Sequence, residues 1–178
     1  MSTRVFVLPI LVTSFLCAAG CANKETVRAV QGPSTPTTSA AVTPVAVTTS
    51  HGNIGVSTDI ARACAIEFSD ADKAPRFDFD QSALLPGDRA VLNQVAACVT
   101  TGPLKGRALK LIGRADPRGE AEYNMALGEH RSGSAWKYLT ALGVDKGKLA
   151  ETSRGKLDAS GTDEQGWARD RRVDIVLR

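Results

Sequence analysis

The sequence predicts an α/β (α+β) two-layer domain, with helices on one face of a mixed sheet. Four short segments between residues 76 and 177 have the residue pattern of strands. Two stretches with apolar residues at helical spacing separate the first three of these segments. The resulting order, strand–helix–strand–helix–strand–strand, is typical of a sheet covered by helices.

The expected strands are short. Phenylalanine and aspartate alternate over residues 76–80, which is the period-two mark of a half-buried strand. The second and third strands are expected at 108–112 and 149–153. The chain closes with a strand over 172–177. One face of this last strand is apolar and consists of Val173, Ile175 and Leu177.

Two helices are expected, one on each side of the second strand. The first follows Pro86, because proline favours a helix start. Its apolar side consists of Val91, Leu92, Val95, Ala96 and Val99. The second runs from about Glu120 to Leu142 and stops at Gly143. Between the last two strands, the polar loop 158–166 has room for one turn of helix.

The N-terminus has the layout of a secretory signal peptide. One basic residue, Arg4, precedes an apolar run over residues 5–16, and small residues follow. The run is too short to span a bilayer. A buried strand or helix is the alternative, but nothing polar interrupts the run and a low-complexity tract follows it. We therefore expect residues 1–20 to be a signal peptide.

Residues 18–21, Ala-Ala-Gly-Cys, resemble a bacterial lipobox, whose cysteine is acylated and becomes the mature N-terminus. Cys21 would then carry lipid such as palmitate, and Ala22 after it points to the outer membrane by resemblance to the enterobacterial sorting rule. The alternative is an ordinary secretory cut near Ala19 that leaves Cys21 as a free thiol. A lone thiol is an awkward product in an oxidising compartment, which favours the lipoprotein.

A linker and a globular domain are expected after Cys21. Residues 22–58 are rich in Thr, Ser, Ala and Pro, have no sustained period, and contain few large apolar residues. Such a tract cannot bury enough surface to offset its ordering entropy. We therefore expect a lipidated, disordered tether over 21–58 and a domain over 59–178.

Two cysteines, Cys64 and Cys98, remain in the expected domain. In an exported protein a disulfide is the favoured state of such a pair. Two buried, reduced thiols are the alternative.

Composition and spacing argue against several function classes. A formal charge of +3 spread over mixed acids and bases, with Trp 2, Tyr 2 and Phe 5, makes no nucleic-acid footprint. The two histidines, His51 and His130, support neither a metal site nor a catalytic triad. Asp78 and Asp80 form a close carboxylate pair, but no second base or nucleophile accompanies them. We expect no nucleic acid, metal, cofactor or enzymatic activity.

The stretch GRADPRGEAEYNMALGEHR, residues 113–131, contains an acid, an amide and a guanidinium. It resembles the central motif of the OmpA C-terminal-like domain family, and most closely the peptidoglycan-associated lipoprotein branch. Residues 77–80 match the first-strand Phe-Asp-x-Asp of that branch, and 171–173 match its closing Arg-Arg-Val. The resemblance covers nearly all of 70–178 and implies the OmpA-like β-α-β-α-β-β fold.

The resemblance implies non-covalent binding of peptidoglycan through the meso-diaminopimelate of its stem peptide. The binding residues that it implies are Phe79, Asp80, Asp116, Asn124, Leu127 and Arg131. The chemistry fits independently, because diaminopimelate presents an ammonium and a carboxylate on one carbon. An aspartate suits the ammonium, and a guanidinium can hold the carboxylate with two hydrogen bonds. The alternative is an ion pair and a capping group on a solvated helix face.

Together these features predict an outer-membrane lipoprotein that holds the cell wall, with the domain facing the periplasm. Its partners would be peptidoglycan and, through acylated Cys21, the outer-membrane lipid. The alternative is a protein-interaction module of a Tol-type or secretion envelope complex with little wall binding of its own. The sequence leaves open whether Tol-system proteins such as TolB are partners.

Overall fold

The computed structural model describes residues 49–68 and 76–178, with the side chains of 49–51 left out. The expected signal peptide, the lipidation of Cys21 and most of the expected tether lie outside the described residues. They remain predictions from the sequence.

The described residues form a five-stranded mixed sheet with the order β1-β2-β5-β3-β4. The strands are β1 (Thr49–His51), β2 (Ile54–Val56), β3 (Leu109–Arg114), β4 (Leu149–Gly155) and β5 (Val173–Leu177). β1 and β2 are antiparallel, and β2 runs parallel to β5. β3 is parallel to β4 and antiparallel to β5. The last strand of the chain therefore lies in the middle of the sheet.

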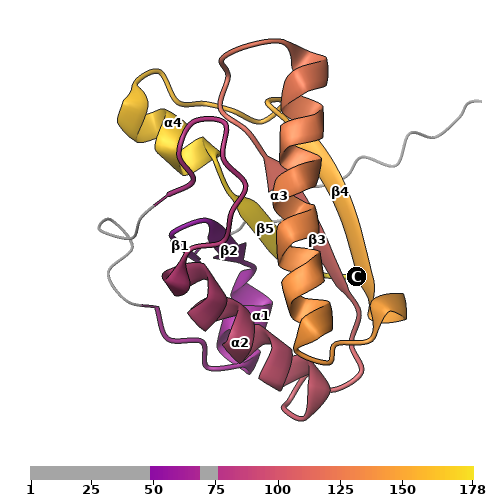
Figure 1. Cartoon of the computed structure of the whole chain (residues 1–178). Coiled ribbons are helices and arrows are strands. Elements are labelled where there is room, and N and C mark those ends of the chain that lie inside the picture. The colour runs from indigo at the N-terminus through magenta and orange to yellow at the C-terminus, as the bar shows by residue number, and fades with distance from the viewer. Residues whose placement is uncertain (1–48, 69–75) are drawn as a thin grey trace, which may run out of the picture. The chain divides into compact units, whose positions relative to one another are not determined.

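Helices cover this sheet, as the sequence predicts. In the described residues they are α1 (Thr58–Ala63), α2 (Pro86–Thr100), α3 (Ala121–Ala141) and α4 (Glu164–Asp170), with a 3-10 turn η1 (Lys146–Lys148). Figure 1 shows α3 lying along β3 and β4, with α2 beside its lower half. The α/β class and the mixed sheet are confirmed. None of the described helices is both long enough and apolar enough to cross a bilayer.

The two long helices begin and end close to where the sequence predicts. All five apolar residues expected on the inner side of α2 are buried in the core. In β5 the expected face is also buried at Val173 and Ile175, while Leu177 is partly buried. Asp174, on the other face of β5, is buried as well, because Arg114 and Arg172 pair with it.

The first expected strand, 76–80, is wrong. Residues 76–78 have no regular structure, and 79–80 form a turn in which Asp80 has a φ of +62°. Phe77 is buried whereas 60% of Phe79 is exposed, so the two rings do not share one face as strand residues would. The position beside β5 is instead taken by β2, which pairs with it over Ile54–Val56.

The expected boundary of the tether at residue 58 is also wrong. β1 and β2 form a hairpin inside that tract, and Ile54 and Val56 are fully buried in the core. The buried carboxylate of Asp88, at the start of α2, accepts hydrogen bonds from Asn53 N at 3.0 Å and Asn53 Nδ2 at 2.6 Å. A three-residue strand in a Thr- and Ser-rich tract is stabilised by these distant partners, and local composition does not reveal them.

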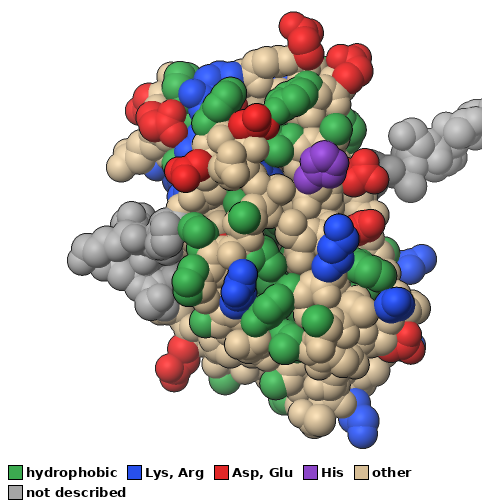
Figure 2. Space-filling view, in the orientation of Figure 1, with side chains coloured by type: hydrophobic (Ala, Val, Ile, Leu, Met, Phe, Trp, Pro, Cys, Tyr) green, Lys and Arg blue, Asp and Glu red, His purple; other side chains and the backbone are tan. Residues whose placement is uncertain are grey.

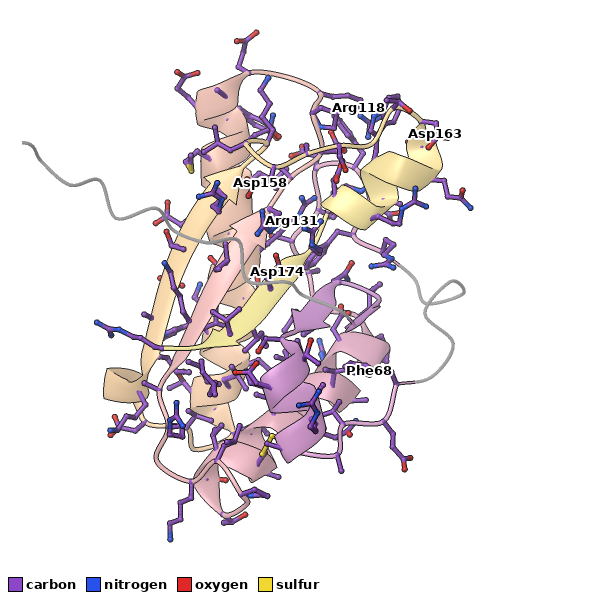
Figure 3. All side chains as sticks on the ribbon, turned by 180° about the vertical axis from the view of Figure 1, so that it is seen from behind. Phe68, Arg118, Arg131, Asp158, Asp163 and Asp174 are labelled. Carbon is purple, nitrogen blue, oxygen red and sulfur yellow. A yellow bond between two sulfur atoms is a disulfide. The ribbon has the colours of Figure 1, made fainter. Side chains whose placement is uncertain are left out.

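Cys64 and Cys98 form a disulfide, which confirms the favoured state of the pair. Their Cα atoms lie 5.6 Å apart, and the bond links the end of α1 to α2. Figure 3 shows this bond in yellow between the two helices at the lower end of the domain. The bridge therefore attaches the N-terminal segment of the domain to the rest of the core.

Replacing both cysteines by serine should lower the free energy of unfolding by roughly 3–4 kcal/mol, because the bridge closes a loop of 34 residues. Urea unfolding of oxidised and reduced protein measures this difference. The reduced wild-type protein serves as the control and should match the double variant. Equal midpoints for oxidised and reduced protein would contradict the prediction.

Candidate functional site

The residues of the 113–131 motif gather at one end of the sheet. β3 ends at Arg114, the loop 115–120 carries Asp116 and Arg118, and α3 then returns along the sheet. Figure 3 shows Arg131 near the upper ends of β3 and β5, and Arg118 near α4. Figure 2 shows acidic, basic and apolar side chains intermixed over this upper end of the domain. Residues from the loop, α3, α4 and the turn 79–80 therefore meet in one region.

Glycines let α3 approach the sheet closely at this point. A Cβ atom added to Gly113 in β3 would lie only 1.7 Å from the carbonyl oxygen of Gly128 in α3. A Cβ atom on Gly155, where φ is +49°, would lie 2.9 Å from Met125 N. The helix backbone therefore touches the strands directly, which carries Asn124 and Arg131 into the fold.

Arg131 is fully buried, and backbone oxygens hold its guanidinium. Its Nε donates to Gln81 O at 2.8 Å, and its Nη1 donates to Arg114 O at 2.9 Å. Its Nη2 makes a longer contact of 3.5 Å with Asp78 O, and the Phe77 ring lies 4.9 Å from the guanidinium carbon. The side chain thus links α3, the end of β3 and the 78–81 segment.

The charge of Arg131 has no direct counter-ion in the described part of the chain, where no carboxylate lies within ion-pair distance of it. The pKa of Arg131 is lowered to about 10, chiefly by burial and also by the positive charge of Arg171, while Asp116 and Asp80 act in the opposite direction. The group is therefore still charged at neutral pH. Its two terminal nitrogens each have an N–H group beyond the contacts above, but no part of the side chain is exposed.

Asp116 is also buried, and its carboxylate is surrounded by donors. Arg118 donates from its backbone N at 3.1 Å, from Nε at 3.2 Å and from Nη2 at 2.8 Å, and Arg171 Nη1 donates at 3.1 Å. Burial by itself would raise the pKa of Asp116, but the hydrogen bonds from Arg118 and Arg171 outweigh it and hold the pKa below 3.8. The carboxylate is ionised at neutral pH.

Arg171 is a site residue that the sequence analysis did not assign. This buried side chain donates from Nε to Phe77 O at 2.6 Å and from Nη2 to Glu164 Oε1 at 2.8 Å, in addition to its bond with Asp116. Arg171 therefore contacts both Phe77, whose ring packs against Arg131, and the carboxylate of Asp116. The closing Arg-Arg-Val segment was the signal that could have identified it.

The other expected residues lie around these two charges. Asn124 Nδ2 donates to Arg118 O at 2.6 Å and to Glu120 O at 3.0 Å, which fixes the loop that carries Asp116. The Tyr123 hydroxyl donates to Asp80, which joins α3 to the turn 79–80. Leu127 is half-buried one turn after Asn124.

The expected residues therefore come together, but not as a simple pair. Asp116 and Arg131 lie close enough for their charges to interact, yet each has its own partners and they do not contact each other. Phe79 is brought in through Arg118, whose guanidinium carbon lies 4.6 Å from the ring centre. The arrangement offers one buried anion and one buried cation at neighbouring positions, which is the chemistry of a receptor for a zwitterion.

The described residues contain no cluster of three histidine, cysteine, aspartate or glutamate side chains that could hold a metal ion. Some other carboxylates near the site are paired with arginine. Asp158, for example, contacts Arg154 and Arg114, and the hydrogen bond from Arg154 is the main reason that its pKa is lowered to about 2.

Comparison with known proteins gives a consistent result. The chain is 40% identical over 103 residues to the peptidoglycan-associated lipoprotein of Pseudomonas aeruginosa, and 39% identical over 108 residues to outer membrane protein A of Bordetella avium. These matches cover 56% and 57% of this chain, and 58% and 52% of the respective relatives. The chain thus spans between half and two thirds of the length of these relatives.

The fold has a solved counterpart. The crystal structure of the peptidoglycan-associated lipoprotein from Burkholderia pseudomallei matches with a TM-score of 0.54 and 36% sequence identity, over 57% of this chain and 86% of that one. The family model described as the OmpA family matches residues 76–172, which include the turn 79–80, the loop before α3, α3 itself and Arg171. With this match over more than half of its length, the chain belongs to the OmpA family.

Proposed function

We propose that this protein binds peptidoglycan non-covalently, as an envelope protein, by holding the ammonium and carboxylate of diaminopimelate in the stem peptide. The observation that carries the proposal is the buried guanidinium of Arg131, which has no carboxylate partner among the described residues. A buried charge without a counter-ion is costly, and groups perturbed in this way are frequent at functional sites. Similar proteins named peptidoglycan-associated lipoproteins support this ligand.

Each residue has a distinct role in the proposed complex. Arg131 receives the ligand carboxylate through its terminal N–H groups, which requires the residues that cover its buried side chain to move, and Asp116 receives the ammonium. Asn124 holds the loop that carries Asp116 and does so through two backbone carbonyls. Phe79, Asp80 and Leu127 border the site from the turn and from α3. No step requires bond cleavage, so the proposed activity is binding and not catalysis.

The proposed location is the outer membrane, with the domain facing the periplasm. Three acyl chains on Cys21 would make anchoring effectively permanent, whereas one chain binds a membrane only marginally. Many anchored copies facing one polymer would raise the effective concentration of a modest individual contact. We therefore propose that the protein couples the outer membrane mechanically to the cell wall.

A test of the site uses sedimentation with isolated sacculi and the variant Asp116→Asn. This change keeps the shape of the side chain but removes the negative charge, so the bound fraction should fall at least about tenfold at subsaturating protein. Asp145→Asn, an exposed residue that caps the 3-10 turn, is the matched control and should bind as wild type does.

A pair of soluble stem peptides identifies the chemical group that is recognised. A peptide with meso-diaminopimelate should compete with sacculi, whereas one with lysine at the same position lacks the carboxylate and should compete poorly. Equal competition by both peptides would reject the zwitterion as the ligand. If wild-type protein captures Tol-type partners but never sediments with sacculi, the protein is an interaction module instead.

A further inference from the structure

Arg118 occupies the carboxylate that the proposed ligand would need. A carboxylate accepts about four hydrogen bonds. Asp116 already receives four, and three of these come from Arg118. Nε and Nη2 of Arg118 approach the two carboxylate oxygens as a fork, with one nitrogen on each oxygen. No acceptor position is left for an ammonium group from outside.

The guanidinium of Arg118 is also held between two aromatic rings. Its central carbon lies 4.6 Å from the centre of the Phe79 ring and 4.2 Å from the centre of the Trp167 ring. Both distances are within the range of cation–π attraction. Glu164 of α4 adds a weaker contact, with 3.6 Å between its Oε2 and Nη1 of Arg118. The turn 79–80 and α4 therefore form a slot that is filled by a side chain of the same protein.

Arg118 can move away from Asp116 more easily than Arg171, the other arginine that contacts this carboxylate. Arg171 is buried and is held at three places, by Phe77 O, Asp116 and Glu164. Arg118 is 33% exposed, and its stacking partner Phe79 is 60% exposed. Movement of the Arg118 side chain into solvent would free one acceptor position on each oxygen of the Asp116 carboxylate, while Arg118 N stays on Oδ1 and Arg171 stays on Oδ2.

We infer that Arg118 is a self-ligand of this site: its guanidinium occupies the place on Asp116 that the ammonium of the bound ligand takes, and it leaves the slot between Phe79 and Trp167 when the ligand binds. This inference rests on the proposed function, because it requires a cationic group to reach Asp116. With a self-ligand, the observed affinity equals the affinity of the open site multiplied by the fraction of time that the site is open. Arg118 thus sets the strength of the wall contact without touching the bound ligand.

The experiment measures binding and the surroundings of Trp167 together. The chain has two tryptophans, so Trp136→Phe leaves Trp167 as the reporter in the parent protein. A soluble diaminopimelate stem peptide is titrated into this parent and into the parent with Arg118→Gln. The glutamine variant should bind about tenfold more tightly, as expected for a site that is otherwise open about one tenth of the time.

The emission of Trp167 adds a readout that a merely structural role would not change. In the parent, binding should alter this emission, because the stacked guanidinium leaves the ring. In Arg118→Gln the emission should already be altered before ligand is added and should change little on binding. Arg89→Gln removes a guanidinium stacked on Tyr138 at 5.9 Å and is the control, which should match the parent in both measurements.

The outcomes separate this inference from the proposed function. If the parent binds the peptide and a folded Arg118→Gln binds it equally or more weakly, the self-ligand is refuted while wall binding stands. If the parent does not bind the peptide at all, both the self-ligand inference and the proposed function are refuted. Thermal melts of each variant verify that the glutamine protein is folded, and Arg118→Lys, which keeps the charge but loses the planar fork, should bind with intermediate affinity.

Discussion

Arg131→Lys should abolish detectable binding to sacculi even though it keeps the positive charge. A lysine ammonium cannot reproduce the fork that donates to Gln81 O and Arg114 O and still present N–H groups to a ligand. We expect a loss of more than about fiftyfold in affinity for the diaminopimelate peptide, since both the ligand contact and the geometry of the 78–81 segment are lost. Titration calorimetry with the soluble peptide measures this change.

The same position should also matter for stability. Arg131→Ala leaves the backbone oxygens of Gln81 and Arg114 without their donor inside the fold. Its free energy of unfolding should therefore fall by about 3–5 kcal/mol, which urea unfolding can measure.

Arg154→Lys is the matched control for both measurements. This arginine lies in β4 with 42% of its side chain exposed and pairs with Asp158, so its replacement should change stability by less than about 0.5 kcal/mol and leave binding intact. Wild-type affinity in a folded Arg131→Lys protein would show that a forked cation is not required and would remove the main support for the proposed site.

Gly113→Ala is expected to destabilise the domain by at least about 4 kcal/mol, although it adds a single methyl group. The new Cβ atom would lie 1.7 Å from the carbonyl oxygen of Gly128, and both groups belong to the backbone of packed elements. Relief of this clash requires α3 to move away from β3. Because Asn124 and Arg131 lie on α3 while Asp116 follows β3, the site should lose its geometry together with stability.

Gly133→Ala provides a strict comparison for this effect. Gly133 lies in α3 as Gly128 does, but a Cβ atom there would be 3.6 Å from the nearest atom, the carboxylate of Glu151, which is an ordinary contact. Alanine at this half-buried helical position, where the added methyl group has room, should raise the free energy of unfolding by about 0.5–1 kcal/mol. Urea unfolding of both variants tests the contrast, and similar midpoints would mean that the close contact of α3 with β3 is not needed.

The helices and the inner strands could be predicted because their signals are local. The apolar residues of α2 recur at helical spacing, and α3 begins after Glu120 and ends just before Gly143. The motif around Asp116 and Arg131 is also continuous in sequence, so the sequence predicted a candidate site and correctly indicated the family. Contacts within one continuous segment can be predicted from the spacing of its residues.

The parts of the fold that the sequence did not predict depend on contacts between distant segments. Residues 76–80 alternate as a strand does, but β2 already takes the position beside β5. Nothing near residue 54 indicates that its partner is Val173, more than a hundred positions later. The role of Arg118 was equally hidden, since it depends on Phe79 and Trp167 from two other parts of the chain.

The amino-acid order alone determined the identity of the polar groups and the helix that presents Asn124 and Arg131. The tertiary structure decided how these groups are satisfied: Arg131 by backbone oxygens, and Asp116 by Arg118 and Arg171. The physical reason is that a buried charge takes whichever partner the packing brings within hydrogen-bond distance. That partner comes from another element of the fold, and the residues next to the charged group in the sequence do not reveal it.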